Sequence, residues 1–322
     1  MIDVEYPQGV TKCLDKGFIR LVDSMGSDAA IVQAARVSYG KGTTKVNRDK
    51  ALIRYLLRHR HSTPFEMVEL KFHAKMPIFV ARQWVRHRTA NINEYSLRYS
   101  EAQRDFYIPQ KEDIHFQSQF NKQGRDETEV PHELKEKVVK YFEEISKKTF
   151  SIYNELNEAG IARELARGIL PVNLYTDWYW KNDLHNIFHF LRLRMDEHAQ
   201  YEIRVFADAM ASFVKKVVPI AYEAFEDYIL NGISFSKLEK ELLVTRFPKR
   251  VIDDLKDEVI YRIVASLNAD KVRSNDELYK LYKQNDGRDC EEDFGIKWKT
   301  GSLETGNIFE MREFLQKLTN LY

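Results

Sequence analysis

Residues 68–73 alternate apolar and polar side chains, and this alternation constrains the fold more than any other feature. Val68, Leu70 and Phe72 would face one side of a strand, and the residues between them would face the other. Residues 17–23 are rich in β-forming side chains and indicate a second strand. Most of the remaining chain has helical periodicity. We therefore expect an α+β fold, in which a small antiparallel or mixed sheet packs with several long helices.

Capping residues support the helices that this periodicity predicts. Ser27 and Asp28 suit a helix start, and Gly160 suits the C-terminal cap of a long helix. Pro64 disfavours helix at Thr63, so a turn is expected over 61–65. The expected helices span residues 28–37, 47–56, 77–85, 131–159, 162–170, 183–194, 198–216 and 219–230.

The last part of the chain changes character. It is charged and mostly helical by pattern, with expected helices at 251–267, 276–283 and 308–318 around a loop at 285–306. We expect a main domain over residues 1–235 and a helical C-terminal extension of unknown role over 236–322.

The composition argues against several classes of protein. The 322 residues carry a net charge of +1, so no overall field favours nucleic acid or an acidic membrane surface. No apolar run approaches the about 20 residues of a membrane span, and no signal-peptide pattern is present. Cys13 and Cys290 are far apart and not in metal-ligand spacing. We expect a cytoplasmic protein without a metal site or a disulfide framework.

Residues 86–99 concentrate side chains that carry chemistry. Arginines bind phosphate oxygens in bidentate fashion, a serine adds a neutral donor, and a His–Glu pair can move protons or hold a heterocycle. Exposed Arg–Glu ion pairs without function are the ordinary alternative. The position of the run favours a site, because it follows a partly buried helix. The members of the run are Arg86, His87, Arg88, Glu94, Tyr95, Ser96, Arg98 and Tyr99.

Three further segments, 61–66, 162–173 and 191–204, share this chemical character. The first presents a hydroxyl and a carboxylate, although a plain helix-to-strand turn would look the same. In the second, Arg163 and Arg167 lie on one helical face, where an internal Arg–Glu bridge is the alternative to an anionic ligand. In the third, Arg194 follows apolar residues and could hydrogen-bond the carbonyl oxygen and ring nitrogen of a pyrimidine.

Together the four segments resemble the flavin-dependent thymidylate synthases. The hallmark of that family is Arg-His-Arg, seven residues and Ser, which here is Arg86-His87-Arg88, then residues 89–95, then Ser96. The similarity covers about residues 15–232 in the family's order, through residues 16–18, 34–38, 61–66, 77–84, 170–176 and 198–203.

The resemblance implies a flavin site and a nucleotide site. FAD contacts are implied at Thr63, Glu66, Arg86, His87, Arg88, Glu94, Asp183, His185, His189 and His198, with Asn186 nearby. Contacts to dUMP are implied at Gln83, Arg86, Glu94, Ser96, Leu97, Arg98, Arg167 and Arg194, with Ser96 and Arg98 near the phosphate. Arg194 is the implied catalytic residue, which promotes ionisation at N3 of the uracil ring.

Some positions depart from the family's pattern. Many members have Asn-Ala-Arg where this chain has Asp183-Leu184-His185, and Asn where it has His189. Histidines can also donate hydrogen bonds to a cofactor. On an apolar helix, however, a histidine satisfied within the core is the ordinary expectation.

The reaction implied is reductive methylation of dUMP to dTMP. NADPH reduces FAD, 5,10-methylenetetrahydrofolate supplies the carbon, and no cysteine nucleophile is used. The chain has no Gly-x-Gly-x-x-Gly fingerprint, so a dinucleotide would be held on a non-Rossmann surface. The resemblance also implies a homotetramer whose sites draw residues from several chains.

Two other functions remain open from the residues alone. One is a related pyrimidine-modifying enzyme with another nucleotide or one-carbon product. The other is an RNA- or DNA-binding module that uses arginines with aromatic stacking platforms, against which the net charge and Glu94 argue. Its candidate residues would be Arg82, Arg86, Arg88 and Arg98 with Trp84, Tyr95 and Tyr99.

Overall fold

The structure is a computed structural model that describes residues 7–37, 46–118, 124–246, 250–251, 253–256, 314 and 317. The chain forms two compact units. One comprises Met1–Gly42 with Leu56–Leu230, and the other comprises Thr43–Tyr55 with Asn231–Tyr322. All five described strands belong to the first unit.

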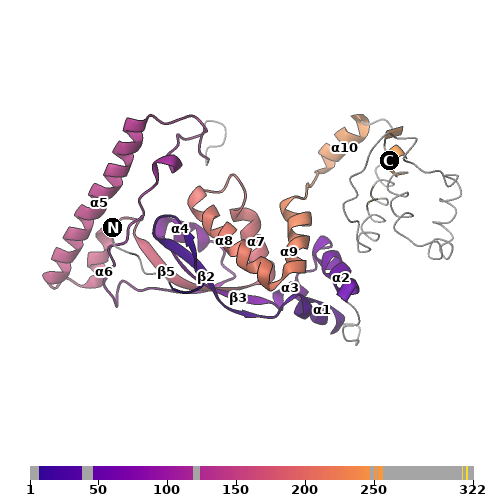
Figure 1. Ribbon diagram of the computed structural model, residues 1–322, viewed down its shortest axis with the longest axis horizontal. Helices are drawn as coiled ribbons and strands as arrows, with labels where there is room; N and C mark the ends of the chain where they lie inside the picture. The colour runs from indigo at the N-terminus through magenta and orange to yellow at the C-terminus, as the bar shows by residue number, and fades with distance from the viewer. Residues whose placement is uncertain are drawn as a thin grey trace. The chain divides into compact units, whose positions relative to one another are not determined.

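A five-stranded antiparallel sheet organises the first unit (Figure 1). The order is β1-β2-β3-β5-β4, and β3 pairs with β2 on one side and β5 on the other. Leu70 and Phe72 are fully buried, so the strand predicted from the alternation is confirmed. The α+β class is confirmed as well. The strands are β1 (Thr11–Cys13), β2 (Gly17–Met25), β3 (Glu69–Pro77), β4 (Asn91–Glu94) and β5 (Tyr175–Asp183).

Three strands, β1, β4 and β5, were not predicted. In the pairing of β5 with β3, Trp178 lies opposite Ala74 and Trp180 lies opposite Phe72. The aromatic side chains of β5 alternate between the buried and the outer face of the sheet. That alternation is visible in the sequence once the strand is known. β1 and β4 contain three and four residues, and such short segments become strands only through pairing with β2 and β5.

Helices α4 (Ile78–Trp84), α7 (Leu184–Arg194) and α8 (Tyr201–Val217) cover the apolar face of the sheet (Figure 1). Trp84 is fully buried, and its ring stacks on Phe190 of α7 with centroids 4.9 Å apart. The same ring meets Trp178 and Trp180 of β5 edge-on, at 5.5 and 5.8 Å. Because Trp84 ends α4, this packing positions the residues that follow it.

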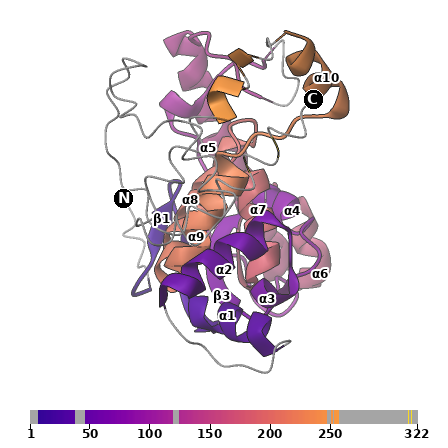
Figure 2. The same ribbon diagram turned by 90° about the vertical axis from the view of Figure 1, so that its right-hand side faces the viewer.

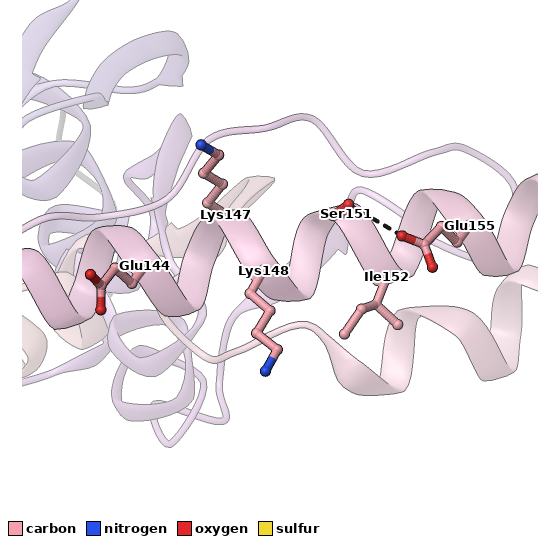
Figure 3. Close-up of a pocket in the computed structure, with 6 residues that line it drawn as sticks. All are labelled: Glu144, Lys147, Lys148, Ser151, Ile152 and Glu155. Carbon is pink, nitrogen blue, oxygen red and sulfur yellow. Dashed lines mark hydrogen bonds between the residues drawn. The ribbon is translucent and has the colours of Figure 1, made fainter.

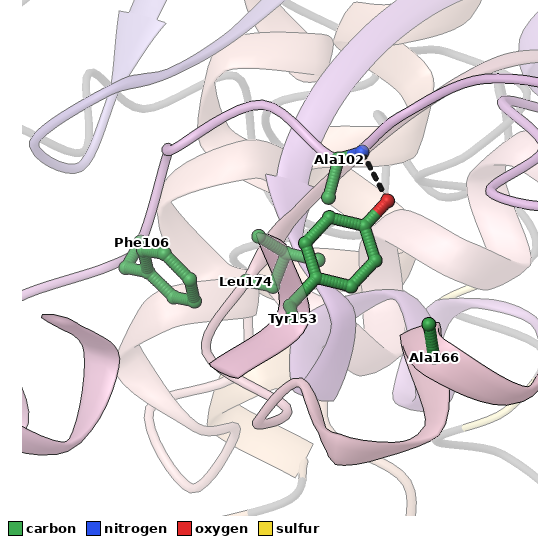
Figure 4. Close-up of a cluster of buried hydrophobic side chains, with 5 residues drawn as sticks. All are labelled: Ala102, Phe106, Tyr153, Ala166 and Leu174. Atoms are coloured by element: carbon green, nitrogen blue, oxygen red, sulfur yellow. Dashed lines mark hydrogen bonds between the residues drawn. The ribbon is translucent and has the colours of Figure 1, made fainter. Parts of the chain in front are cut away.

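Helix α5 (His132–Glu158) ends as predicted at Gly160, which has a positive φ of 78°. The N–H groups of Gly160 and Ile161 donate to the carbonyls of Asn157 and Leu156, which is the Schellman pattern. The buried side of α5 carries Tyr153, whose hydroxyl accepts a hydrogen bond from the Ala102 N–H at 3.0 Å (Figure 4). The surrounding apolar cluster contains Ala102, Phe106, Tyr153, Ala166 and Leu174.

Short helices complete the first unit. α6 (Arg163–Ala166) and η2 (Arg167–Ile169) together form the helix predicted over 162–170, and η1 (Lys111–Asp113) lies in the loop before α5. α9 (Pro219–Phe225) and the π-helical turn η3 (Glu226–Leu230) match the prediction for 219–230.

Helix α1 (Asp28–Val37) begins where Ser27 and Asp28 predicted. The Asp28 carboxylate also accepts hydrogen bonds from the Ile220 and Ala221 N–H groups, both at 2.9 Å, at the start of α9. α3 (Thr63–Glu66) replaces the predicted turn, since Pro64 lies in the first helical turn, where its missing N–H is not needed. α1 and α3 lie side by side in both views (Figures 1 and 2).

The second unit contributes α10 (Lys237–Arg246) and the first ten residues of α2 (Val46–Arg58). The helices predicted at 251–267, 276–283 and 308–318 lie almost entirely outside the described residues. A domain boundary at 235 stays a prediction. Within the described ranges, no helix is long and apolar enough to span a membrane, and no three metal-binding side chains cluster together.

Candidate active site

The Arg-His-Arg motif lies in the turn that follows α4. The His87 N–H donates to the Trp84 carbonyl at 3.0 Å, so the turn is tied to the buried end of the helix. His87 points inward, is 9% exposed and meets Phe190 edge-on at 4.9 Å. Arg86 and Arg88 are exposed on either side of it. The three consecutive residues therefore divide into one buried imidazole and two exposed cations.

Arg194, at the end of α7, lies against this imidazole. Its Nε donates to Nε2 of His87 at 3.1 Å, and its Nη2 lies 3.5 Å from the Gln83 carbonyl oxygen. Burial, with smaller contributions from Arg194 and His189, lowers the pKa of His87 to about 4. His87 is therefore neutral near pH 7, accepts at Nε2 and carries its proton on Nδ1. The fold thus brings His87, which is expected to contact FAD, together with Gln83 and Arg194, which are expected to contact dUMP.

Glu94 lies at the end of β4, where the edge strand pairs with β5. The Thr176 hydroxyl donates to Glu94 Oε1 at 2.6 Å, and the Tyr95 N–H donates to the Asp177 carbonyl at 2.8 Å. This pairing fixes the direction of the chain before it reaches residues 96–98.

Residues 96–98 form a turn beside α6. Ser96 Oγ accepts from the Arg98 N–H at 3.3 Å, and the exposed Arg98 guanidinium lies 3.3 Å from Glu164 of α6. Leu97 packs against the cluster around Tyr153. The serine therefore serves as a local acceptor, and nothing beside it among the described residues would activate it as a nucleophile.

The two arginines of the 162–173 segment have different surroundings. Arg163 pairs with Glu101 at 3.0 Å, which is an exposed Arg–Glu bridge of the kind expected as the alternative to a ligand. Arg167 is half-buried, and its guanidinium makes no hydrogen bond or ion pair with any residue that the structure describes. Of the two, Arg167 has the guanidinium left for an anion.

The flavin positions on α3 and α7 lie close in the fold. Phe65 of α3 packs on Phe188 of α7, with centroids 6.4 Å apart, so the exposed Thr63 and Glu66 are held beside α7. Asp183 caps α7 and accepts from Asn186 at its backbone and side-chain nitrogens, at 2.9 and 2.7 Å. Asp183 and Asn186 therefore satisfy each other at the start of the helix.

The histidines of α7 are not core residues. His185 and His189 are both exposed, because they lie on the face of α7 opposite to Ile187, Phe188 and Leu191. The His189 ring meets the His87 ring at 5.8 Å, so this exposed face adjoins the motif. His198 is also exposed and pairs with Asp196 at 2.9 Å. The alternative of satisfied core histidines is wrong for His185 and His189.

A polar network that links Gln83 to the buried Glu202 was missed by sequence reasoning. The Gln83 amide donates to Gln200, and Gln200 donates to Glu202 at 2.8 Å. Tyr107 and Arg125 donate to the same carboxylate at 3.0 and 2.5 Å. The sequence did contain a signal, because a glutamate within the apolar face of 198–216 needs partners. Those partners lie 77 and 95 positions away, and only the fold identifies them.

One hollow in the described part of the chain is lined by none of these residues. It lies on α5 and is lined by Glu144, Lys147, Lys148, Ser151, Ile152 and Glu155 (Figure 3). All six come from one helix, and Ser151 donates to Glu155 at 3.4 Å. None of the expected site residues lines this hollow.

Comparisons with known proteins agree with the resemblance. The family described as thymidylate synthase complementing protein matches residues 20–220. A flavin-dependent thymidylate synthase of Rickettsia conorii is 56% identical over 238 residues, which cover 70% of this chain and 81% of that protein. The Rickettsia typhi protein of the same description is 50% identical over 284 residues, covering 84% of this chain and 93% of that one.

A solved structure is also similar. The crystal structure of a UMP/dUMP methylase, PolB, from Streptomyces cacaoi bound with 5-Br dUMP has a TM-score of 0.63 and 32% sequence identity. The match covers 69% of this chain and all of that one.

Proposed function

This chain belongs to the flavin-dependent thymidylate synthase family, and from that membership we propose that it methylates dUMP reductively to dTMP. The observation that carries the proposal is the contact between Arg194 and the neutral His87 of the unbroken Arg-His-Arg motif. It joins a residue expected to activate the base to one expected to hold the flavin.

Arg194 would activate the pyrimidine ring. Only its Nε and Nη2 have partners among the described residues, so the remaining N–H groups are available to a ligand. A half-buried guanidinium can donate to a ring carbonyl oxygen and stabilise the negative charge that ionisation at N3 spreads over the ring. His87 accepts without adding charge, so it orients the guanidinium and leaves its positive charge to the substrate.

The residues around the motif fit FAD. Arg86 and Arg88 form no ion pair with any described residue, so two cations are available to a diphosphate. His87 would offer Nδ1–H as a neutral donor. When bound, FAD supplies the hydride that completes the methyl group. The proposed contacts are Thr63, Glu66, Arg86, His87, Arg88, Glu94, Asp183, His185, His189 and His198.

The nucleotide would bind along the second half of the motif. Ser96, Arg98 and Arg167 are proposed near the phosphate, since Arg167 is unpaired within the described residues and Arg98 has only an exposed partner. The remaining proposed dUMP contacts are Gln83, Arg86, Glu94, Leu97 and Arg194.

A mechanism without a cysteine nucleophile is consistent with Cys13. Burial, with a smaller contribution from Asp208, raises the pKa of its thiol to about 12. A thiol of that pKa is protonated at neutral pH and unreactive. Cys290 lies outside the described residues.

The remaining features of the proposal come from the family. NADPH would be the reductant and 5,10-methylenetetrahydrofolate the carbon donor. The enzyme would be a cytoplasmic homotetramer with shared sites, and the role of residues 236–322 as an extension would be tested by truncation near residue 235.

The decisive experiment is anaerobic turnover of the purified protein. We expect a yellow protein with a flavin spectrum that forms dTMP from dUMP and methylenetetrahydrofolate as NADPH is oxidised. UMP is tested in parallel, because the similar Streptomyces cacaoi protein is described as a UMP/dUMP methylase. No methylated product with full FAD occupancy would contradict the proposal, and methylation of UMP alone would change its substrate.

A further inference from the structure

The two oxygens of the buried Glu202 have separate partners. The side chain is 5% exposed, and Oε1 accepts from the Tyr107 hydroxyl at 3.0 Å and from Arg125 Nη2 at 2.5 Å. Oε2 accepts from the Gln200 amide at 2.8 Å. An ionised carboxylate beside a guanidinium has no hydrogen to donate. Whatever group faces Oε2 must therefore be a donor.

This requirement is transmitted through two amides. Gln200 must direct its NH₂ group to Glu202, so its Oε1 faces Gln83. Gln83 must then direct its own NH₂ group to Gln200. Gln83 Oε1 remains, and it accepts no hydrogen bond from any residue in the described ranges. The buried carboxylate thus decides which end of the Gln83 amide is left for a ligand, and that end is the acceptor.

We infer that Glu202 is a specificity-determining residue, which holds Gln83 Oε1 toward the pyrimidine and so selects a base with an N–H at N3. The inference rests on the proposed function, in which Gln83 contacts the nucleotide. Uracil offers N3–H to this acceptor, whereas N3 of cytosine is itself an acceptor and would be repelled. Glu202 acts through Gln200, without touching the base.

Arg194 supplies the complementary group. Its Nη2 lies 3.5 Å from the main-chain oxygen of Gln83, so the guanidinium donor lies against the residue whose side chain offers the acceptor. A carbonyl beside an N–H, as on uracil, matches that pair. The bond to Gln83 forms with the neutral ring and is given up when N3 ionises. Because it stabilises the neutral base, its effect is measured in equilibrium binding constants.

The substitution Glu202→Gln keeps the size and shape of the side chain and reverses the direction of the hydrogen bonds that run from residue 202 through Gln200 to Gln83. These two hydrogen bonds are called the relay. Tyr107 and Arg125 both donate to Oε1, so they keep an oxygen on their side and place the new NH₂ group toward Gln200. Gln200 then accepts from residue 202 and donates to Gln83. Gln83 in turn accepts from Gln200 and presents its NH₂ group to the ligand, which suits the N3 acceptor of cytosine.

The test is equilibrium binding of dUMP and dCMP to the flavin-loaded protein by isothermal titration calorimetry. The wild type should prefer dUMP by about 100-fold, because dCMP loses one hydrogen bond and meets a like lone pair. Glu202→Gln should shift the ratio of the two dissociation constants toward dCMP by about tenfold or more. Glu136→Gln, an exposed glutamate of α5 paired with Lys111, is the matched control and should leave the ratio unchanged.

Gln200→Met is a second variant in case the first does not fold. It breaks the relay at near-constant volume, so Gln83 can turn and the preference for dUMP should fall about tenfold. Equal binding of dUMP and dCMP by the wild type would overturn the inference, as would unchanged ratios in folded variants. If the wild type binds neither nucleotide, the proposed function fails instead.

Discussion

Replacement of Arg194 by alanine tests the centre of the proposed site. The side chain has one good hydrogen bond within the protein, from Nε to His87 at 3.1 Å, and a long contact from Nη2 to the Gln83 carbonyl. Burial lowers the pKa of Arg194, which marks a charge partly withdrawn from water and effective on a neighbouring ligand. One charge-assisted hydrogen bond to the developing ring anion contributes about 1.5–3 kcal/mol. Its loss should slow methylation by about 10- to 150-fold.

The assay separates chemistry from cofactor loading. Flavin content is measured by absorbance, and dTMP formation is followed anaerobically in a single turnover with saturating dUMP. Arg194→Ala should retain flavin, because the expected cofactor contacts lie on other residues. Arg192→Ala, two positions earlier on the exposed side of α7, is the control and should stay within about twofold of wild type. Single-turnover rates for Arg194→Ala equal to those of wild type would refute the argument.

Three further predictions concern individual side chains. The pKa of His87 is lowered from 6.5 to about 4, so the neutral imidazole stabilises the fold fully above pH 6.5, and this contribution is lost as the pH falls toward 4. In His87→Gln, the fall in unfolding free energy between these pH values should therefore be smaller by on the order of 2–3 kcal/mol. Identical pH profiles for the variant and the wild type would contradict this. Tyr153→Phe leaves the Ala102 N–H unpaired in the core and should cost about 1–3 kcal/mol in denaturant unfolding, whereas Tyr141→Phe, at an exposed position of the same helix, should cost almost nothing. Cys13→Ala should keep wild-type turnover per bound flavin, and a fall of more than about tenfold would show that the thiol takes part.

Local signals in the sequence were sufficient for most helices. The end of α5 at Gly160, which adopts a positive φ, depends on residues within one helical turn of it. The start of α1 at Asp28 likewise depends on residues within one turn. The alternation over residues 68–73 likewise predicts β3 without reference to any partner. Such elements are encoded by neighbouring residues, and therefore a reading along the chain finds them.

The strands β1 and β4 and the state of the α7 histidines depended on distant residues. A three- or four-residue segment is a strand only if another strand pairs with it, and β4 pairs with β5 more than 80 positions later. His185 and His189 lie on an apolar helix, and they are exposed because the rest of the unit packs against the other side of that helix. Periodicity locates the apolar face of a helix. Whether a residue at the edge of that face is buried or exposed depends on what packs against the helix.

The sequence by itself determined the family, through the spacing from Arg86 to Ser96, and the kinds of side chain available to a site. The tertiary structure decided how those side chains act on one another. It placed Arg194 against His87 across 107 positions, and it buried that imidazole, which keeps it neutral. It also placed Gln83 at the end of a chain of hydrogen bonds that starts at the buried Glu202. Charge state and hydrogen-bond direction depend on burial and on neighbours in space, and neither is written in the order of residues along a chain.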